Sequence, residues 1–162
     1  MRCLGYDLPS RFPLMPDNPG KFVKETRLDR IFNQSFGFLV RLGIGFAHNY
    51  LLITRGRKTG REYATPVNLL EMNGRRYLVA SRGETGWVRN ARAAGTVVLK
   101  KGAKQWTWKV RELSLDERPP VIKEFLDRFA SSVQRFYTIR AGAPVEEFRA
   151  VAASNPVFEL SA

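Results

Sequence analysis

The sequence of 162 residues has a single cysteine, Cys3, and a single histidine, His48. One cysteine excludes an internal disulfide, and the two together are too few for a zinc site made of four Cys and His ligands, so we expect no metal. The chain also lacks a Gly-x-Ser-x-Gly nucleophile elbow, a Walker phosphate loop and a Gly-x-Gly-x-x-Gly dinucleotide fingerprint. Few groups of this chain can therefore react directly, which favours either a binding protein or an enzyme whose reactive atoms belong to a cofactor.

The N-terminus shows no basic-then-apolar signal pattern, and we expect a cytoplasmic protein. Four prolines within the first 20 residues predict an irregular arm over residues 1–22, followed by a single domain over residues 23–162. The most apolar run, Phe36–Phe46, has eleven residues and is too short for a bilayer, which needs about 20. Packing on a sheet and peripheral contact with a membrane surface both stay open for this run.

Hydrophobic periodicity predicts strands that form hairpins, with helices at both ends and one in mid-chain. The expected strands cover residues 49–54, 63–72, 76–80, 96–99, 105–113 and 157–160, and the expected helices cover residues 24–46, 87–94, 116–129, 134–139 and 145–153. Asn73-Gly74 is typical of a tight hairpin turn, and Gly95 is placed to end the mid-chain helix. This pattern predicts an α+β domain built on a small antiparallel β-barrel.

The formal net charge of +12 is concentrated in the middle of the chain. Between Arg55 and Arg111 there are 14 basic residues and three acidic ones, an excess of 11 positive charges. A positive field of this kind attracts nucleic acid, an anionic membrane or an acidic small molecule. Trp106 and Trp108 offer stacking faces for a single strand, but their spacing of two puts both on one face of a strand and favours burial, so we expect no nucleic-acid partner.

The densest positive segment is Arg55-Gly56-Arg57-Lys58-Thr59-Gly60-Arg61, between two expected strands. Its glycines let the backbone approach a ligand closely, and successive amides in such a turn can bind an anion. Arginine forks hold phosphate or carboxylate by paired bonds, while a lysine adds a point charge. The segment therefore predicts an anion site at Arg55, Arg57, Lys58, Thr59 and Arg61.

Further motifs follow at Thr65-Pro66, Val79-Ala80-Ser81-Arg82-Gly83 and Trp87-Val88-Arg89-Asn90-Ala91-Arg92-Ala93. Together with the basic turn, they resemble the deazaflavin-dependent nitroreductase family over about residues 25–160. The resemblance implies a split antiparallel β-barrel, related to the flavin-binding pyridoxamine-phosphate-oxidase-like proteins. It also implies an oxidoreductase that transfers hydride from the reduced deazaflavin coenzyme F420 to a quinone-like or nitroaromatic acceptor.

The same resemblance implies roles for individual residues. Arg57, Lys58 and Arg61 would hold the phosphate and the carboxylates of the coenzyme's polyanionic tail. Thr65 and Pro66 would face the deazaflavin ring, and Ser81, Arg82 and Gly83 would line its edge. Trp87 and Asn90 would close the pocket.

On the acceptor side, Phe136-Tyr137 stands at about the place of a tyrosine-bearing segment in the family. Tyr137 could donate a hydrogen bond to a quinone or nitro oxygen as a catalytic residue, or could be a tyrosine of the core. The alternative for the whole protein is a non-catalytic binder of FMN, haem or a fatty acid on the same barrel. As partners we expect the coenzyme and a small hydrophobic acceptor, and either a monomer or a homodimer.

Overall fold

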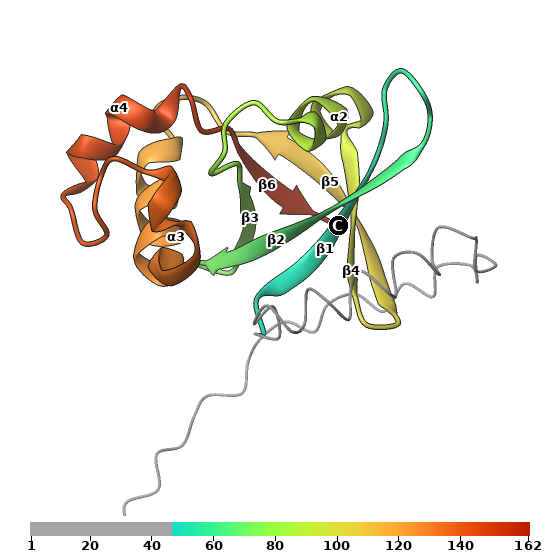
Figure 1. Ribbon diagram of the computed structural model, residues 1–162, viewed down its shortest axis with the longest axis horizontal. Helices are drawn as coiled ribbons and strands as arrows, with labels where there is room; N and C mark the ends of the chain where they lie inside the picture. Colours follow the sequence, from blue (N-terminus) through green and yellow to red (C-terminus); the bar gives the residue numbers. More distant parts are fainter. Residues whose placement is uncertain (1–46) are drawn as a thin grey trace, which may run out of the picture.

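The computed structural model describes residues 47–162, which form a β-barrel with helices against its side and one end (Figure 1). The elements, in chain order, are β1 (Asn49–Arg55), β2 (Glu62–Met72), β3 (Arg75–Val79), α2 (Gly86–Ala94), β4 (Thr96–Lys101), β5 (Lys104–Glu112), α3 (Arg118–Val133), the 3-10 helices η1 (Gln134–Phe136) and η2 (Val145–Phe148), α4 (Arg149–Ala152) and β6 (Val157–Ser161).

The barrel is closed, with antiparallel strands in the order β1-β2-β3-β6-β5-β4. The last strand, β6, lies between β3 and β5, where Phe158 pairs with Leu78 and Leu160 pairs with Val110. Pairing of Leu52 with Leu99 joins β1 to β4 and closes the ring. Closure leaves no strand edge unpaired, and the α+β barrel predicted from the sequence is confirmed.

The strands separate two hydrophobic cores because successive side chains point to opposite faces. Leu69 and Leu78 belong to the core inside the barrel, which α2 covers at one end, whereas Leu70 and Tyr77 belong to the core between the barrel and α3. Trp108 is buried in the inner core, in agreement with its predicted strand face.

Two turns take the backbone conformations that their sequences predict. Asn73 and Gly74 both have positive φ, 52° and 72°, as a tight hairpin between β2 and β3 needs. Gly95 ends α2 at φ 67°, and its amide donates to the carbonyl of Ala91. Local chemistry is sufficient to predict both turns.

The helices near the C-terminus differ from the sequence prediction. α3 begins later, at Arg118, because its two prolines fit the first turn, and it continues to Val133 past a non-helical residue, Phe129. The expected helix over residues 134–139 is wrong beyond Phe136, because Tyr137 adopts an extended backbone and buries its ring in the outer core.

The predicted arm, the boundary at residue 23, the helix over residues 24–46 and the apolar run Phe36–Phe46 lie outside the described residues. Within residues 47–162, no helix combines the length and the apolar character that crossing a bilayer requires.

Candidate functional site

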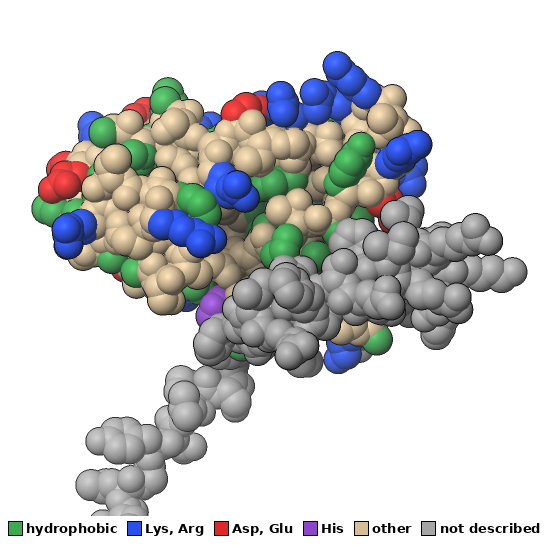
Figure 2. Space-filling view, in the orientation of Figure 1, with side chains coloured by type: hydrophobic (Ala, Val, Ile, Leu, Met, Phe, Trp, Pro, Cys, Tyr) green, Lys and Arg blue, Asp and Glu red, His purple; other side chains and the backbone are tan. Residues whose placement is uncertain are grey.

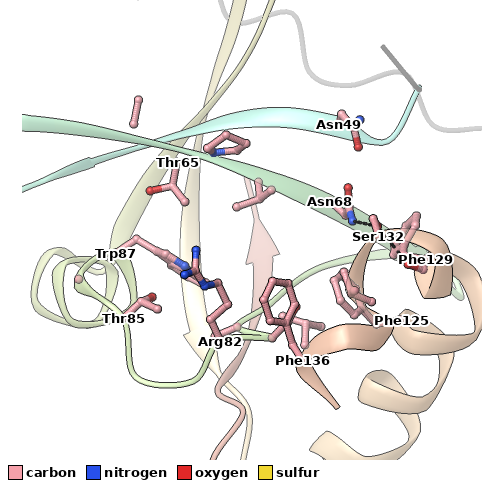
Figure 3. Close-up of a pocket in the computed structure, with 18 of the residues that line it drawn as sticks. Asn49, Thr65, Asn68, Arg82, Thr85, Trp87, Phe125, Phe129, Ser132 and Phe136 are labelled. Atoms are coloured by element: carbon pink, nitrogen blue, oxygen red, sulfur yellow. Dashed lines mark hydrogen bonds between the residues drawn. The ribbon is translucent and has the colours of Figure 1, made fainter. Parts of the chain in front are cut away.

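A cavity of about 1440 Å³ lies between the barrel and the C-terminal part of α3. Its walls come from the β1–β2 turn, the middle of β2, the β3–α2 loop, the first turns of α2, and residues 125–136 of α3 and η1. Figure 3 shows Arg82 extending into this space between Trp87 and Phe136, with Phe125 and Phe129 further along the α3 side. The cavity thus has a polar, cationic side and an aromatic side.

Most residues that the sequence predicts for coenzyme binding lie in this wall. Those lining the cavity are Arg57, Lys58, Thr59, Thr65, Pro66, Ser81, Arg82, Trp87 and Asn90. Arg55 and Arg61 flank the same turn without lining the cavity, and Gly83 lies in the β3–α2 loop behind it. The fold therefore brings three predicted segments, far apart in the sequence, to one hollow.

The basic turn is held in a compact form by its own backbone. The amide of Gly56 donates to the carbonyl of Arg61 over 2.7 Å, and the amide of Gly60 donates to the carbonyl of Gly56 over 2.8 Å. A Cβ at Gly56 would lie 2.6 Å from the ring of Tyr63 and 2.8 Å from the hydroxyl of Thr59, so any other residue there requires these two side chains to move. This glycine lets the turn fold closely against the start of β2.

Asn90 on α2 ties the basic turn to the body of the protein. Its Oδ1 accepts hydrogen bonds from the backbone amide and the guanidinium of Arg57, both over 3.4 Å, and its Nδ2 donates to Thr54 over 3.4 Å. Asn90 and Thr54 are buried, whereas Arg57 is exposed. The sequence predicts Asn90 as a residue that closes the pocket, and its contacts give it the further role of orienting Arg57.

The cations at this turn differ from most other arginines of the barrel. Within residues 47–162, Arg57 and Lys58 form no ion pair, whereas Arg76, Arg92 and Arg111 each pair with a glutamate. Figure 2 shows basic side chains gathered over the tip of the β1–β2 hairpin and the neighbouring α2. The uncompensated positive charge of this turn thus lies where a ligand can reach it.

The β3–α2 loop is fixed from behind by Asn155. Its Nδ2 donates to the carbonyls of Ala80 and Ser81 over 2.9 and 3.2 Å. Gly83 has φ 76°, and a Cβ there would lie 3.1 Å from the carbonyl of Ser154, so the loop packs tightly on the segment before β6. These contacts present Ser81 and Arg82 to the cavity, where the guanidinium of Arg82 lies 5.5 Å from the ring centre of Phe136.

Tyr137, predicted as a catalytic residue, is buried and is not among the residues that line the main cavity. Its hydroxyl makes no hydrogen bond of normal geometry with the described residues. Burial raises the pKa of Tyr137 to about 12, although the Ser81 hydroxyl lies close enough to act in the opposite direction. Its role as a donor to the acceptor stays a prediction.

Several lining residues were not predicted from the sequence. Those at the α3 end are His48, Asn49, Asn68, Phe125, Phe129 and Ser132. Burial, and then the charges of Lys101 and Arg128, lower the pKa of His48, whose ring lies 4.6 Å from that of Phe129. The one available signal was Asn68, a lone amide inside the apolar strand sequence Val67-Asn68-Leu69-Leu70.

The family model of F420H(2)-dependent quinone reductases matches residues 27–145 of this sequence. The chain belongs to this family. The prediction of an oxidoreductase that uses the deazaflavin coenzyme F420 is thereby confirmed, as is the resemblance on which it rested.

Solved structures show similarity of fold to this reductase. One, described as an F420-H2-dependent reductase (FDR-A), is 24% identical, with a TM-score of 0.47, over 71% of this chain and 95% of that one. Another, a protein of unknown function from Agrobacterium tumefaciens, is 19% identical, with a TM-score of 0.50, over 76% of this chain and 53% of that one. No curated protein matches the sequence.

The residues of the reductase's cavity fit such a coenzyme. Arg57 and Lys58 offer cations without a carboxylate partner among the described residues, which suits the phosphate and the tail carboxylates. Pro66 and Trp87 give apolar surface for a planar ring. Thr85 adds a buried hydroxyl with no hydrogen-bond partner in the described part of the chain, at the start of α2.

Proposed function

We propose that this reductase transfers hydride from reduced F420 to a small hydrophobic acceptor, a quinone or a nitroaromatic compound, within the cavity between the barrel and α3. The observation that carries the proposal is the division of this cavity. Cations without a carboxylate partner line the part next to the β1–β2 turn, and aromatic side chains of α3 and η1 line the opposite part, where Arg128 and Arg135 also contribute. A polyanionic coenzyme and an apolar acceptor need these two surfaces side by side.

On the coenzyme side, Arg57 and Lys58 hold the phosphate and the tail carboxylates, and Arg61 and Arg55 contribute to the surrounding positive field. Asn90 keeps Arg57 in one orientation through its two hydrogen bonds. A preoriented guanidinium loses less conformational freedom when the anion binds.

Further into the cavity, Thr65 and Pro66 lie against one face of the ring, and Ser81 and Arg82 lie along its edge, with Gly83 behind them in the same loop. Trp87 closes this part of the cavity, and its ring is itself fixed against Phe158 with ring centres 5.7 Å apart. Rigid packing of this kind matters because hydride transfer needs the reacting atoms about 3–3.5 Å apart.

On the acceptor side, Phe125, Phe129 and Phe136 form the apolar surface. When bound, reduced F420 supplies the hydride, and a quinone that receives it takes up one proton to become a hydroquinone. The aromatic side chains exclude water from this part of the cavity, which strengthens polar contacts with the acceptor. The predicted donor Tyr137 lies behind Ser81 and would act at this stage.

The experiment is a titration of F420 with the purified protein, followed by coenzyme fluorescence, for the wild type and for Arg57→Ala with Lys58→Ala. We expect the double variant to raise the Kd at least about 150-fold, since each of the two charged contacts contributes about 1.5–3 kcal/mol. Oxidation of reduced F420 by menadione at saturating coenzyme changes far less, because these cations bind the ground state and the transition state alike.

Lys104→Ala is the matched control, because it removes an exposed cation of the β4–β5 turn, outside the cavity. It should leave the Kd of F420 within twofold of the wild type. An unchanged Kd in the double variant, or an equal loss in both, would contradict the coenzyme site. Failure of bound reduced F420 to be oxidised by any quinone or nitroaromatic compound would contradict the reaction.

A further inference from the structure

Asn49, Asn68 and Ser132 form a polar cluster at the α3 end of the cavity, next to aromatic side chains. The Nδ2 of Asn68 donates to the Oγ of Ser132 over 3.2 Å, and that hydroxyl donates to the carbonyl of Phe129 over 3.0 Å (Figure 3). These bonds fix the amide of Asn68, because its nitrogen faces α3. Its oxygen therefore faces away from α3, toward β1.

Asn49 is the neighbour of Asn68 across the β1–β2 ladder. The carbonyl of His48 accepts the amide of Leu69 over 2.8 Å, which makes Asn49 and Asn68 a non-hydrogen-bonded pair. Side chains of such pairs lie on one face, with Cβ atoms about 4.5–5.5 Å apart. Figure 3 shows the oxygens of the two amides turned toward each other, and the Oδ1 of Asn49 is buried with no hydrogen-bond partner among the described residues.

Two amide oxygens that face each other can only accept hydrogen bonds, so this place suits a donor. The nearest cationic side chains are engaged elsewhere. Lys101 donates to the carbonyl of Ala47, and Arg128 donates to the carbonyl of Glu71 and to the carboxylate of Glu124. A buried acceptor without a partner is costly, which indicates that a bound molecule supplies the donor.

The position of the cluster assigns it to the acceptor rather than to the coenzyme tail. Asn68 lies five residues beyond Tyr63 along β2, about 17 Å from the basic turn. The charges of Lys101 and Arg128, which lower the pKa of the adjacent His48, disfavour a cationic donor here. A neutral hydroxyl or N–H group is the donor that this environment accepts.

We infer that Asn49 and Asn68 bind a neutral hydrogen-bond donor carried by the acceptor, so that the enzyme favours quinones with a hydroxyl or N–H group remote from the reacting carbonyl. This inference rests on the proposed function, because it assigns the acceptor to this cavity. A ligand hydroxyl donates its single proton to one of the two oxygens, and a ligand NH₂ group can donate to both.

The test compares two naphthoquinones that differ in one hydrogen-bond donor, 6-hydroxymethyl- and 6-methoxymethyl-1,4-naphthoquinone. Their Kd values are measured by quenching of the intrinsic tryptophan fluorescence, to which the cavity-lining Trp87 contributes, without coenzyme. We expect the wild type to bind the hydroxymethyl compound about three- to tenfold more tightly, the effect of one neutral hydrogen bond.

Asn49→Leu removes one oxygen at similar volume and should bring the ratio of the two Kd values close to one. Asn49→Asp keeps an oxygen at the same place and should retain the preference for the hydroxymethyl compound. A merely structural role of Asn49 would not predict that this preference follows the oxygen. Gln105→Leu makes a similar change on an exposed residue of β5 and should leave the ratio unchanged.

Equal Kd values in the wild type, or a preference that survives Asn49→Leu, would overturn the inference. The proposed function fails separately, through absence of F420 binding or of F420-dependent quinone reduction. A wild-type preference that Asn49→Leu abolishes supports the amide site even then, since the binding measurement contains no coenzyme. Should F420 bind and reduce both quinones while their Kd values are equal, the amide site alone is refuted.

Discussion

Two sets of cations in this barrel have different surroundings. On the side of β5 and α3, Arg92, Arg111 and Arg118 are bound to glutamates, and Arg92 holds the pKa of Glu112 below its usual range. At the β1–β2 turn, Arg57 and Lys58 have no carboxylate partner within residues 47–162. The first set is compensated by the fold itself, whereas the second is available to an anionic ligand.

The comparison teaches that a high net charge does not by itself locate a binding site. The sequence shows an excess of 11 positive charges between Arg55 and Arg111, but in the described structure Arg75, Arg76, Arg92 and Arg111 of this range pair with glutamates. Only the three-dimensional structure shows which ones stay uncompensated. Stability and coenzyme binding should therefore respond to different substitutions.

The largest expected effect is on stability, from Arg118→Ala. Arg118 is buried and donates to the carbonyls of Leu113 and Ala152, both over 2.9 Å, and to Glu112 over 3.0 Å. Its loss leaves the two buried carbonyls without this donor, while Glu112 keeps Arg92, and we expect a decrease of about 3–5 kcal/mol in the free energy of unfolding. Denaturant unfolding measures this decrease.

Arg149→Ala, at an exposed position of α4, is the control and should change stability by less than about 0.5 kcal/mol. If Arg118→Ala folds at low temperature, its Kd for F420 should equal that of the wild type. A raised Kd for F420 in the folded variant would contradict the distinction between cations that stabilise the fold and cations that bind the coenzyme.

An intermediate effect on stability should appear at high pH. It concerns the buried hydroxyl of Tyr137, which makes no regular hydrogen bond in the described structure, just as Arg57 and Lys58 have no carboxylate partner there. The pKa of Tyr137 rises from its ordinary value of 10 to about 12 on folding, chiefly through burial. Below pH 10 both states keep the proton. Between pH 10 and 12 the unfolded chain releases it first, so the folded state loses about 2–3 kcal/mol.

Tyr137→Phe should remove this part of the alkaline destabilisation, as unfolding curves at pH 9 and pH 11 can measure. At pH 7 its stability should stay close to that of the wild type, because the hydroxyl makes no regular hydrogen bond. An identical loss in both proteins would contradict the raised pKa. A fall in kcat for quinone reduction by this variant would support the predicted donor role of Tyr137.

The sequence predicted features that depend on local chemistry. The strands, the turn at Asn73-Gly74 and the helix end at Gly95 follow from periodicity and from positive φ, and the basic turn and Trp87 follow from motifs. The extended backbone of Tyr137 was not predictable in this way, because burial in the outer core sets it.

The α3 end of the cavity was also missed, for a similar reason. Asn49 and Asn68 are 19 positions apart and become neighbours only through strand register, and Ser132 reaches them only because α3 packs beside β2. No spacing in the sequence brings these three residues together. Contacts of this kind become evident only from the folded barrel.

The smallest effect is expected for Asn90→Ala, because Asn90 contributes both to the fold, through Thr54, and to the orientation of the uncompensated Arg57. This substitution removes no charge, yet it removes the acceptor that orients Arg57 and the donor to Thr54. We expect a loss of about 1 kcal/mol in stability, typical of a neutral hydrogen bond, and a Kd for F420 raised about fivefold to tenfold. The two values come from denaturant unfolding and from fluorescence titration. If Arg57 needed only its charge, Asn90→Ala would leave the Kd unchanged. If Asn90→Ala raises the Kd of the wild type but not that of Arg57→Ala, Asn90 acts through Arg57.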